Sequence, residues 1–310
     1  MYMPEAVSHL HQKIQFPKFN PFELKDKNLI DAYAKRFNPE SCEYNFTNLF
    51  TWQEAYELSF TLYQGRLLIY DGISQCFFMP LGNDLFPEEL VVLALQLKSI
   101  GLNPYFGLFS SDYLKKYPDI ENYFMIKEER DYAEYLYDVK SLCDLTGEKL
   151  HKKKNLISQF IRSFPQYKVH EIKGELKSRC LSFAKELLKK HKQDSNDLVQ
   201  EFSAIETSFR YFEELGLEGI VITVDERLVS FSVFSRLNAS TYDIHFEKSD
   251  PDFKGAAQVI NHETAKYLLD ICKYVNREQD LGIKGLRQAK MSYEPVKLIT
   301  FHSLIFTPSN

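Results

Sequence analysis

The chain has 310 residues, of which 44% are hydrophobic and 15% aromatic, and its formal net charge is -5. This composition supplies apolar material for two domains of ordinary size, so it excludes an intrinsically disordered chain. No window reaches the ~20 apolar residues of a membrane span, and residues 1–16 lack the apolar core and cleavage pattern of a signal peptide. We therefore expect a cytoplasmic protein with no transmembrane segment.

The first half of the chain predicts a mixed α/β domain. After a loosely held arm at residues 1–20, apolar side chains recur at helical spacing in residues 26–37 and 46–56. Three strands of a meander are expected next, at 59–63, 67–70 and 76–79, followed by a helix at 87–99. Two more strands, at 104–109 and 123–127, flank a short helix at 112–117.

Residues 132–160 predict a linking region with two helical patterns. Its second helix opens on basic residues, although the macrodipole favours anions at a helix N-terminus. Residues 148–192 hold 13 Lys or Arg against 4 Glu, in a chain that is acidic as a whole. We expect Lys152, Lys153, Lys154 and Asn155 to bind an anionic partner. The alternative is a solvated charged turn.

The second half predicts another mixed domain. It begins with a strand at 168–172, two helices at 176–191 and 198–215, and a hairpin of strands 219–224 and 228–236. An alternating strand at 241–247, a helix at 255–270 and two final strands at 273–275 and 295–306 follow.

One face of the alternating strand carries Asp243, His245 and Glu247 at about 6.6 Å spacing. At that spacing His245 and Glu247 are able to act together as a proton-shuttling pair, so they are the predicted acid and base. The alternative is a polar sheet face that points to solvent.

Polar residues also gather where the next strand ends. Arg277 is suited to clamp a carboxylate or phosphate, or to pair with one of the acids that follow it. On the predicted helix after it, Lys284, Arg287 and Lys290 share a broad face, and Leu286 and Ala289 are expected to point inward. The predicted binding residues of this region are Asn276, Arg277, Glu278, Asp280, Arg287, Lys290 and Tyr293.

Several segments resemble the family named for the C-terminal domain of phosphatidylglycerol lysyltransferase. They are YDIHFEK, YVNREQDLG and GLRQAKMSYEP, with SCEYNFTNLFTWQEAY and YLYDVKSLCDLTGEKLHKKKNLISQF further upstream. The resemblance implies two acetyltransferase-like (GNAT) domains in tandem, an α/β fold with mixed sheets. It also implies enzymes that transfer an amino acid from charged tRNA to a lipid or a peptide. The family's lysyltransferases carry a membrane-embedded portion ahead of this domain, which we expect this chain to lack, so any lipid contact would be peripheral.

Residues 252–257 depart from a pattern of related enzymes. Acetyltransferases that use coenzyme A resemble one another in a Gln/Arg-x-x-Gly-x-Gly/Ala turn, whose backbone amides hold the diphosphate. Here the turn begins with Asp252, and an acid repels phosphate, although Lys254 is able to compensate. We therefore expect no cofactor, with coenzyme A disfavoured.

The five cysteines are each more than thirty residues apart, and no sequence motif for a metal is present, since His9 and His11 alone are too weak a signal. Metal-free chemistry is expected, in two GNAT-like domains at residues 1–150 and 151–310. The favoured function is transfer of an amino acid from aminoacyl-tRNA to a membrane lipid such as phosphatidylglycerol, or to a cell-wall peptide. The alternatives are an acyl-coenzyme A N-acyltransferase and a non-catalytic binding protein with a degenerate cleft.

Overall fold

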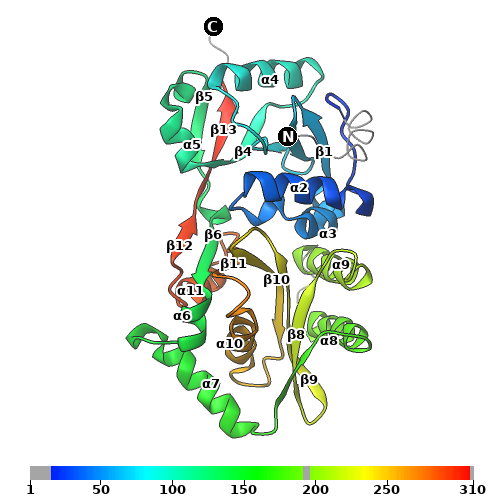
Figure 1. Cartoon of the computed structure of the whole chain (residues 1–310), viewed down its shortest axis with the longest axis vertical. Coiled ribbons are helices and arrows are strands. Elements are labelled where there is room, and N and C mark those ends of the chain that lie inside the picture. Colours follow the sequence, from blue (N-terminus) through cyan, green and yellow to red (C-terminus); the bar gives the residue numbers. More distant parts are fainter. Residues whose placement is uncertain (1–14, 191–195, 308–310) are drawn as a thin grey trace. The chain divides into compact units, whose positions relative to one another are not determined.

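The structure is a computed structural model that describes residues 15–190 and 196–307 (Figure 1). Contacts within the chain divide this part into two units. The first unit holds residues 15–133 and 299–307, and the second holds residues 134–298. Most of the predicted N-terminal arm, including His9 and His11, and the predicted helix end at residue 191 lie outside the described residues.

The first unit contains a six-stranded sheet in the order β1-β2-β3-β4-β13-β5. Strands β3 and β4 run parallel, and the other neighbouring pairs run antiparallel. The elements of this unit are α2 (Lys27–Phe37), α3 (Phe46–Tyr56), β1 (Leu58–Tyr63), β2 (Arg66–Asp71), β3 (Cys76–Phe78), α4 (Pro87–Ser99), β4 (Tyr105–Ser110), α5 (Ser111–Lys116), β5 (Phe124–Glu128) and β13 (Phe301–Phe306).

The second unit contains a seven-stranded sheet in the order β12-β6-β11-β10-β9-β8-β7. Strands β10 and β11 run parallel, and the hairpin predicted in this unit is confirmed as β8 and β9. The elements of this unit are β6 (Glu134–Asp138), α6 (Val139–Asp144), α7 (His151–Ser163), β7 (Lys168–Glu171), α8 (Leu176–Lys190), α9 (Asn196–Arg210), β8 (Glu218–Val224), β9 (Arg227–Arg236), β10 (Thr241–Ser249), α10 (Ala256–Leu268), β11 (Tyr274–Gln279), α11 (Lys284–Met291) and β12 (Lys297–Ile299).

Helix α10 packs on one side of the second sheet, while α8 and α9 lie on the other (Figure 1). The buried residues Val259, Ile260 and Leu268 recur at helical spacing and join the core. The helix begins after Gly255, whose φ of 93° lies in the left-handed region. A Cβ on Gly255 would come within 2.6 Å of the Leu156 carbonyl oxygen, so the backbone of α7 also requires glycine here.

The two sheets share one strand pattern. In each, an antiparallel meander leads to a parallel pair, β3 with β4 and β10 with β11. The next strand in each sheet then comes from a distant part of the chain: β13 lies between β4 and β5, and β6 lies between β11 and β12. No repeat is visible in the sequence, so the strand pattern is what indicates a duplicated domain.

This exchange of strands corrects three predictions about organisation. Residues 134–138, placed in a helical link, form β6 because they pair with β11. The final predicted strand, 295–306, is two strands, β12 in the second sheet and β13 in the first. The contacts consequently divide the chain after residue 133 rather than 150, and residues 299–307 return to the first unit.

Candidate functional site

Strands β10 and β11 separate soon after they pair. Their parallel register ends with Asp243 opposite Asn276, although both strands continue for several residues. Beyond this point Arg277 of β11 donates through Nη2 to Oε1 of Glu247 on β10, at 2.8 Å. The interpretation that paired Arg277 with an acid just after it in the sequence is therefore wrong, because its partner lies on the neighbouring strand.

Two tyrosine rings flank the Arg277 guanidinium. Its Cζ lies 5.8 Å from the ring centre of Tyr137 and 5.2 Å from that of Tyr293, within the range of a cation–π contact. Burial acts to lower the pKa of Arg277, but the Glu247 carboxylate and the two tyrosines outweigh it and raise this pKa. Burial also raises the pKa of Tyr293 to about 12. The site thus holds a permanent guanidinium beside neutral phenols.

Lys153 is a second cation at this place. Its Nζ lies 4.2 Å from the ring centre of Tyr293, and no carboxylate of the described residues lies at ion-pair distance from it. Burial and, second, the charge of Arg277 lower the pKa of Lys153. An anionic ligand would favour the charged form of this amine. We call Lys153, Arg277, Glu247, Tyr137 and Tyr293 the Arg277 cluster.

The other residues of the predicted basic segment have a different position. Lys152, Lys154 and Asn155 are exposed at the start of α7, whereas Lys153 between them is half-buried. Successive residues of a helix point about 100° apart, so a run of four cannot face one ligand. The structure brings one of these four residues into the cluster.

Asp280, which follows β11, anchors helix α11. Its carboxylate is buried and accepts two hydrogen bonds from Arg287, from Nε at 2.9 Å and from Nη2 at 2.7 Å. The Tyr135 hydroxyl and the Gly282 N–H also donate to it. Burial acts to raise the pKa of Asp280, but these donors, Arg287 first, lower it well below its usual range. Asp280 and Arg287 therefore hold the fold of this segment together.

Lys290 also points into the protein. Its Nζ donates to the Arg277 carbonyl oxygen at 2.6 Å and to that of Gln279. The prediction that Leu286 and Ala289 point inward is wrong, because both are exposed. The inward positions of α11 are taken by Arg287 and Lys290 instead.

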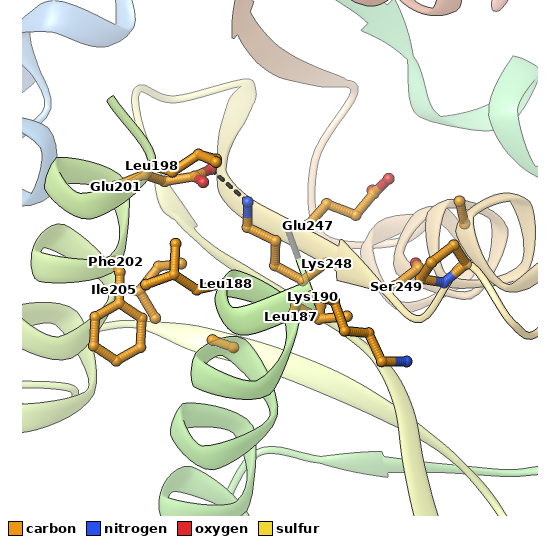
Figure 2. A pocket seen from close by; sticks show the side chains of 13 residues that line it. Leu187, Leu188, Lys190, Leu198, Glu201, Phe202, Ile205, Glu247, Lys248 and Ser249 are labelled. Atoms are coloured by element: carbon orange, nitrogen blue, oxygen red, sulfur yellow. Dashed lines mark hydrogen bonds and ion pairs between the residues drawn. The ribbon is translucent and has the colours of Figure 1, made fainter. Parts of the chain in front are cut away.

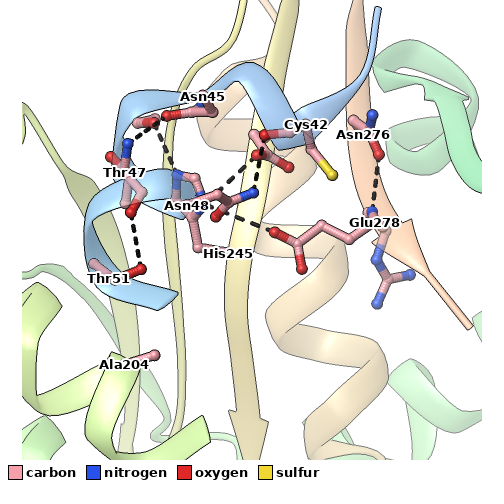
Figure 3. Close-up of polar contacts among 12 residues, drawn as sticks. Cys42, Asn45, Thr47, Asn48, Thr51, Ala204, His245, Asn276 and Glu278 are labelled. Atoms are coloured by element: carbon pink, nitrogen blue, oxygen red, sulfur yellow. Dashed lines mark hydrogen bonds and ion pairs between the residues drawn. The ribbon is translucent and has the colours of Figure 1, made fainter. Parts of the chain in front are cut away.

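His245 lies at a bulge of β10 and is buried (Figure 3). Its Nε2 is 2.8 Å from Ser235 Oγ, and its Nδ1 faces Asp243 Oδ2 at 3.5 Å and Glu278 Oε1 at 3.8 Å. Glu247 points instead to Arg277. The bulge breaks the strict alternation that the sequence predicts, so His245 lies with Asp243 and Glu278 and not in a pair with Glu247.

Three site residues were not predicted from the sequence: Glu134, Tyr135 and Tyr137, all on β6. The Asn276 Oδ1 accepts the N–H of Glu278 at 2.8 Å (Figure 3). The Asn276 amide nitrogen donates to Oε2 of buried Glu134 at 2.5 Å. A signal was available, because the segment EYLYD alternates aromatic with other residues, which is typical of a strand.

A pocket of about 380 Å³ lies between α8, α9 and the end of β10 (Figure 2). Apolar side chains of α8 and α9 line it, and Lys248 donates to Glu201 across it at 2.6 Å. Lys190, also in its lining, contacts Asp250 at 3.0 Å and Asp252 at 2.9 Å. The negative charge of Asp252 is thus balanced by Lys190.

Comparison with known proteins agrees with this architecture. A solved structure of L-PGS from Bacillus licheniformis is 14% identical, covers 92% of this chain and 93% of its own, and superposes with a TM-score of 0.62. A structure of FemX is 10% identical, covers 94% and 97%, and has a TM-score of 0.56. The prediction of two mixed α/β domains in a tandem GNAT-like fold is confirmed.

The family can also be stated. The family model "Phosphatidylglycerol lysyltransferase, C-terminal" matches residues 34–302, so the chain belongs to that family. A conserved protein of unknown function from Bacteroides thetaiotaomicron is 29% identical over 93% of this chain and 99% of its own, with a TM-score of 0.87. Comparison with curated proteins found no match. Among the described residues, no helix has both the length and the apolar character needed to cross a bilayer.

Proposed function

We propose that this protein transfers an amino acid from aminoacyl-tRNA to a hydroxyl or amine of a membrane lipid or cell-wall peptide, at the Arg277 cluster. The family name, which refers to lysyl transfer to phosphatidylglycerol, supports the reaction class. The observation that carries the proposal is Lys153, a half-buried cation next to Arg277 with no carboxylate to neutralise it among the described residues. Of these two adjacent cations only Arg277 is neutralised, by Glu247, so the pair suits a phosphate of the tRNA acceptor end.

In the proposed reaction the acceptor oxygen or nitrogen attacks the carbonyl carbon of the aminoacyl ester. The bond from that carbon to the ribose oxygen of the tRNA breaks, and the acceptor's proton ends on that ribose oxygen. Glu247 is the group proposed to take up this proton, because its Oε2 is buried without a hydrogen-bond partner among the described residues. Arg277 donates to the other oxygen and holds the Glu247 carboxylate in place. We propose that His245 positions the site through Asp243 and Glu278.

We also propose that coenzyme A is not the donor. The start of α10 is closely packed, since α7 approaches Gly255 and the Phe164 ring lies 5.1 Å from that of Phe253. One observation favours the alternative function, an acyl-coenzyme A N-acyltransferase. Lys190 balances the negative charge of Asp252, the residue that would otherwise repel the diphosphate.

A thermal-shift titration distinguishes these two functions, because a ligand that binds only the native state stabilises it by RT ln(1 + [L]/Kd). We expect little stabilisation by coenzyme A or acetyl-coenzyme A. Binding of coenzyme A at micromolar concentration that is lost in Gly255→Asp would favour the acyl-coenzyme A N-acyltransferase. In that event Gly255→Ala, which adds a Cβ but no charge, shows whether the loss comes from the charge or from the Cβ itself, which is strained by the left-handed backbone and by the Leu156 carbonyl oxygen.

The salt dependence of tRNA affinity tests the main proposal. Each neutralised phosphate contributes about 0.7 to 0.9 to the slope of log K against log salt. We expect Lys153→Gln to lower this slope by about one such unit. The matched control is Lys189→Gln, on an exposed position of α8, which changes the net charge equally. Equal slopes in the two variants would contradict a phosphate contact at Lys153.

A further inference from the structure

Three large aliphatic side chains project from the protein within six residues of chain. Leu281 is 54% exposed, Ile283 55% and Leu286 37%. They lie just before and at the start of α11, with the exposed Lys284 among them. Single exposed aliphatic residues are common on protein surfaces, but three in one short segment mark a site of interaction.

The exposure is imposed by a well-ordered turn. The Ile283 N–H donates to the Asp280 carbonyl oxygen at 2.9 Å, and the Arg287 N–H donates to the Ile283 carbonyl oxygen at 2.9 Å. Gly282 is bound to the Asp280 side chain, which Arg287 clamps from the other side. The aliphatic side chains therefore cannot turn inward without breaking the ion pair of Asp280 with Arg287.

Basic residues lie beyond the other end of α11. The end of α11 is connected to the start of α7 through Lys153, which lies over the Tyr293 ring, and through Lys149, which pairs with Glu294 at 2.9 Å. The exposed side chains of Lys152 and Lys154 lie in that first turn of α7, and Lys284 lies in the aliphatic segment itself. Aliphatic groups among lysines are the pattern of an interfacial segment that binds an anionic bilayer.

We propose that residues 281–286 insert into the interface of an anionic lipid bilayer, with Lys284, Lys152 and Lys154 contacting the head groups. A membrane is favoured over a protein partner because three partly exposed side chains fall far short of the ~800 Å² that each partner contributes to a stable protein interface. A bilayer accepts so small an apolar surface when basic residues add to it, and binding is then weak and reversible.

This inference deepens the proposed function, since a lipid acceptor must be reached at a membrane, but it uses other residues. Helix α11 presents Arg287 and Lys290 to the body of the protein and to the carbonyl oxygen of Arg277. The aliphatic segment would therefore connect a membrane directly to β11, the strand that carries Arg277.

Vesicle sedimentation of the full chain tests the proposal without any tRNA. The probes are vesicles of phosphatidylcholine alone and vesicles in which about 30% of the lipid is phosphatidylglycerol. We expect binding to the anionic vesicles, and a loss of roughly tenfold or more in Leu281→Asn/Ile283→Asn. The matched control is Val92→Asn/Leu95→Asn, two similarly exposed residues of α4 at 48% and 51%. We expect that control to bind as the wild type does.

Other outcomes would overturn the proposal. One is equal binding of the two double variants, and another is no binding of the wild-type protein to anionic vesicles. A third is concentration-dependent dimerisation that only Leu281→Asn/Ile283→Asn abolishes, which would assign the segment to a second copy of the chain. Lys153→Gln separates this inference from the proposed function, because we expect it to weaken tRNA binding and leave sedimentation with anionic vesicles unchanged.

Discussion

The same position in the two sheets carries opposite chemistry. In the first unit the parallel pair β3 and β4 sets Phe77 opposite Phe106, both fully buried, with ring centres 5.9 Å apart. In the second unit the parallel pair sets Asp243 opposite Asn276, and an arginine follows. A duplicated framework has thus kept an aromatic core in one copy and collected ionisable groups in the other.

The difference also shows how separated strands satisfy their backbone. Buried N–H and C=O groups that lose a neighbouring strand must find other partners. In the second unit the N–H of Glu278 donates to the side chain of Asn276. The carbonyl oxygens of Arg277 and Gln279 accept hydrogen bonds from Lys290. Lys290 consequently has a structural role beside any role in binding.

The largest effect is expected in the first unit, on stability alone. Phe77→Ala removes a fully buried ring that stacks on Tyr70 at 4.6 Å. We expect the free energy of unfolding to fall by about 3 to 5 kcal/mol, measured by chemical denaturation. Transfer activity per folded molecule should not change, and a specific loss of activity would place chemistry in the first unit.

The next effect concerns the Arg277 cluster. We expect Arg277→Gln to lower kcat/KM for transfer about 100-fold, because it removes a charge-assisted hydrogen bond from the proposed base. Glu247→Gln should cause a similar loss, and the double variant should lose little more, since the two groups act as a unit. The control is Arg236→Gln, in which the arginine also lies over a tyrosine ring, at 4.8 Å from that of Tyr242. A fully additive double variant would mean that the two residues act separately.

The smallest effect, at Asp280, depends on pH. The folded protein lowers the pKa of Asp280 below its ordinary value of 3.8, so this carboxylate stabilises the fold at neutral pH. That contribution is lost as the pH falls through the pKa of the unfolded state and below. Arg287→Gln should cost about 2 kcal/mol at neutral pH, less than a fully buried pair because Arg287 is about a third exposed. Denaturation of both proteins between neutral pH and pH ~3.5 should show this difference shrinking. A constant difference would mean that Arg287 acts through packing.

The sequence predicted most of the elements because their apolar periodicity is strong. The helix at 87–99 and the hairpin of β8 and β9 have the predicted bounds to within a residue or two, since Pro87 and the Asp225-Glu226 turn mark their ends. The resemblance to the family predicted the tandem fold. Strand β6 was missed although EYLYD alternates as a strand does, because five residues are a weak local signal and the partner strand β11 lies some 140 residues away.

The site could be predicted as a set of residues but not as a set of contacts. Arg277 and Glu247 are 30 positions apart and meet only because β10 and β11 separate at that point. The orientation of helix α11 was predicted wrongly because charged side chains normally face water. Here the buried carboxylate of Asp280 attracts Arg287 inward, which turns Leu286 outward.

The exchanged strands also have a consequence for synthesis on the ribosome. Strands β4 and β5 are joined only through β13, whose residues emerge after the whole second unit has been translated. During synthesis the first sheet therefore lacks the strand between β4 and β5 until the second unit has been translated. A nascent chain released before residue 301 would carry that gap permanently, so truncation near the C-terminal end should impair the unit at the opposite end of the sequence.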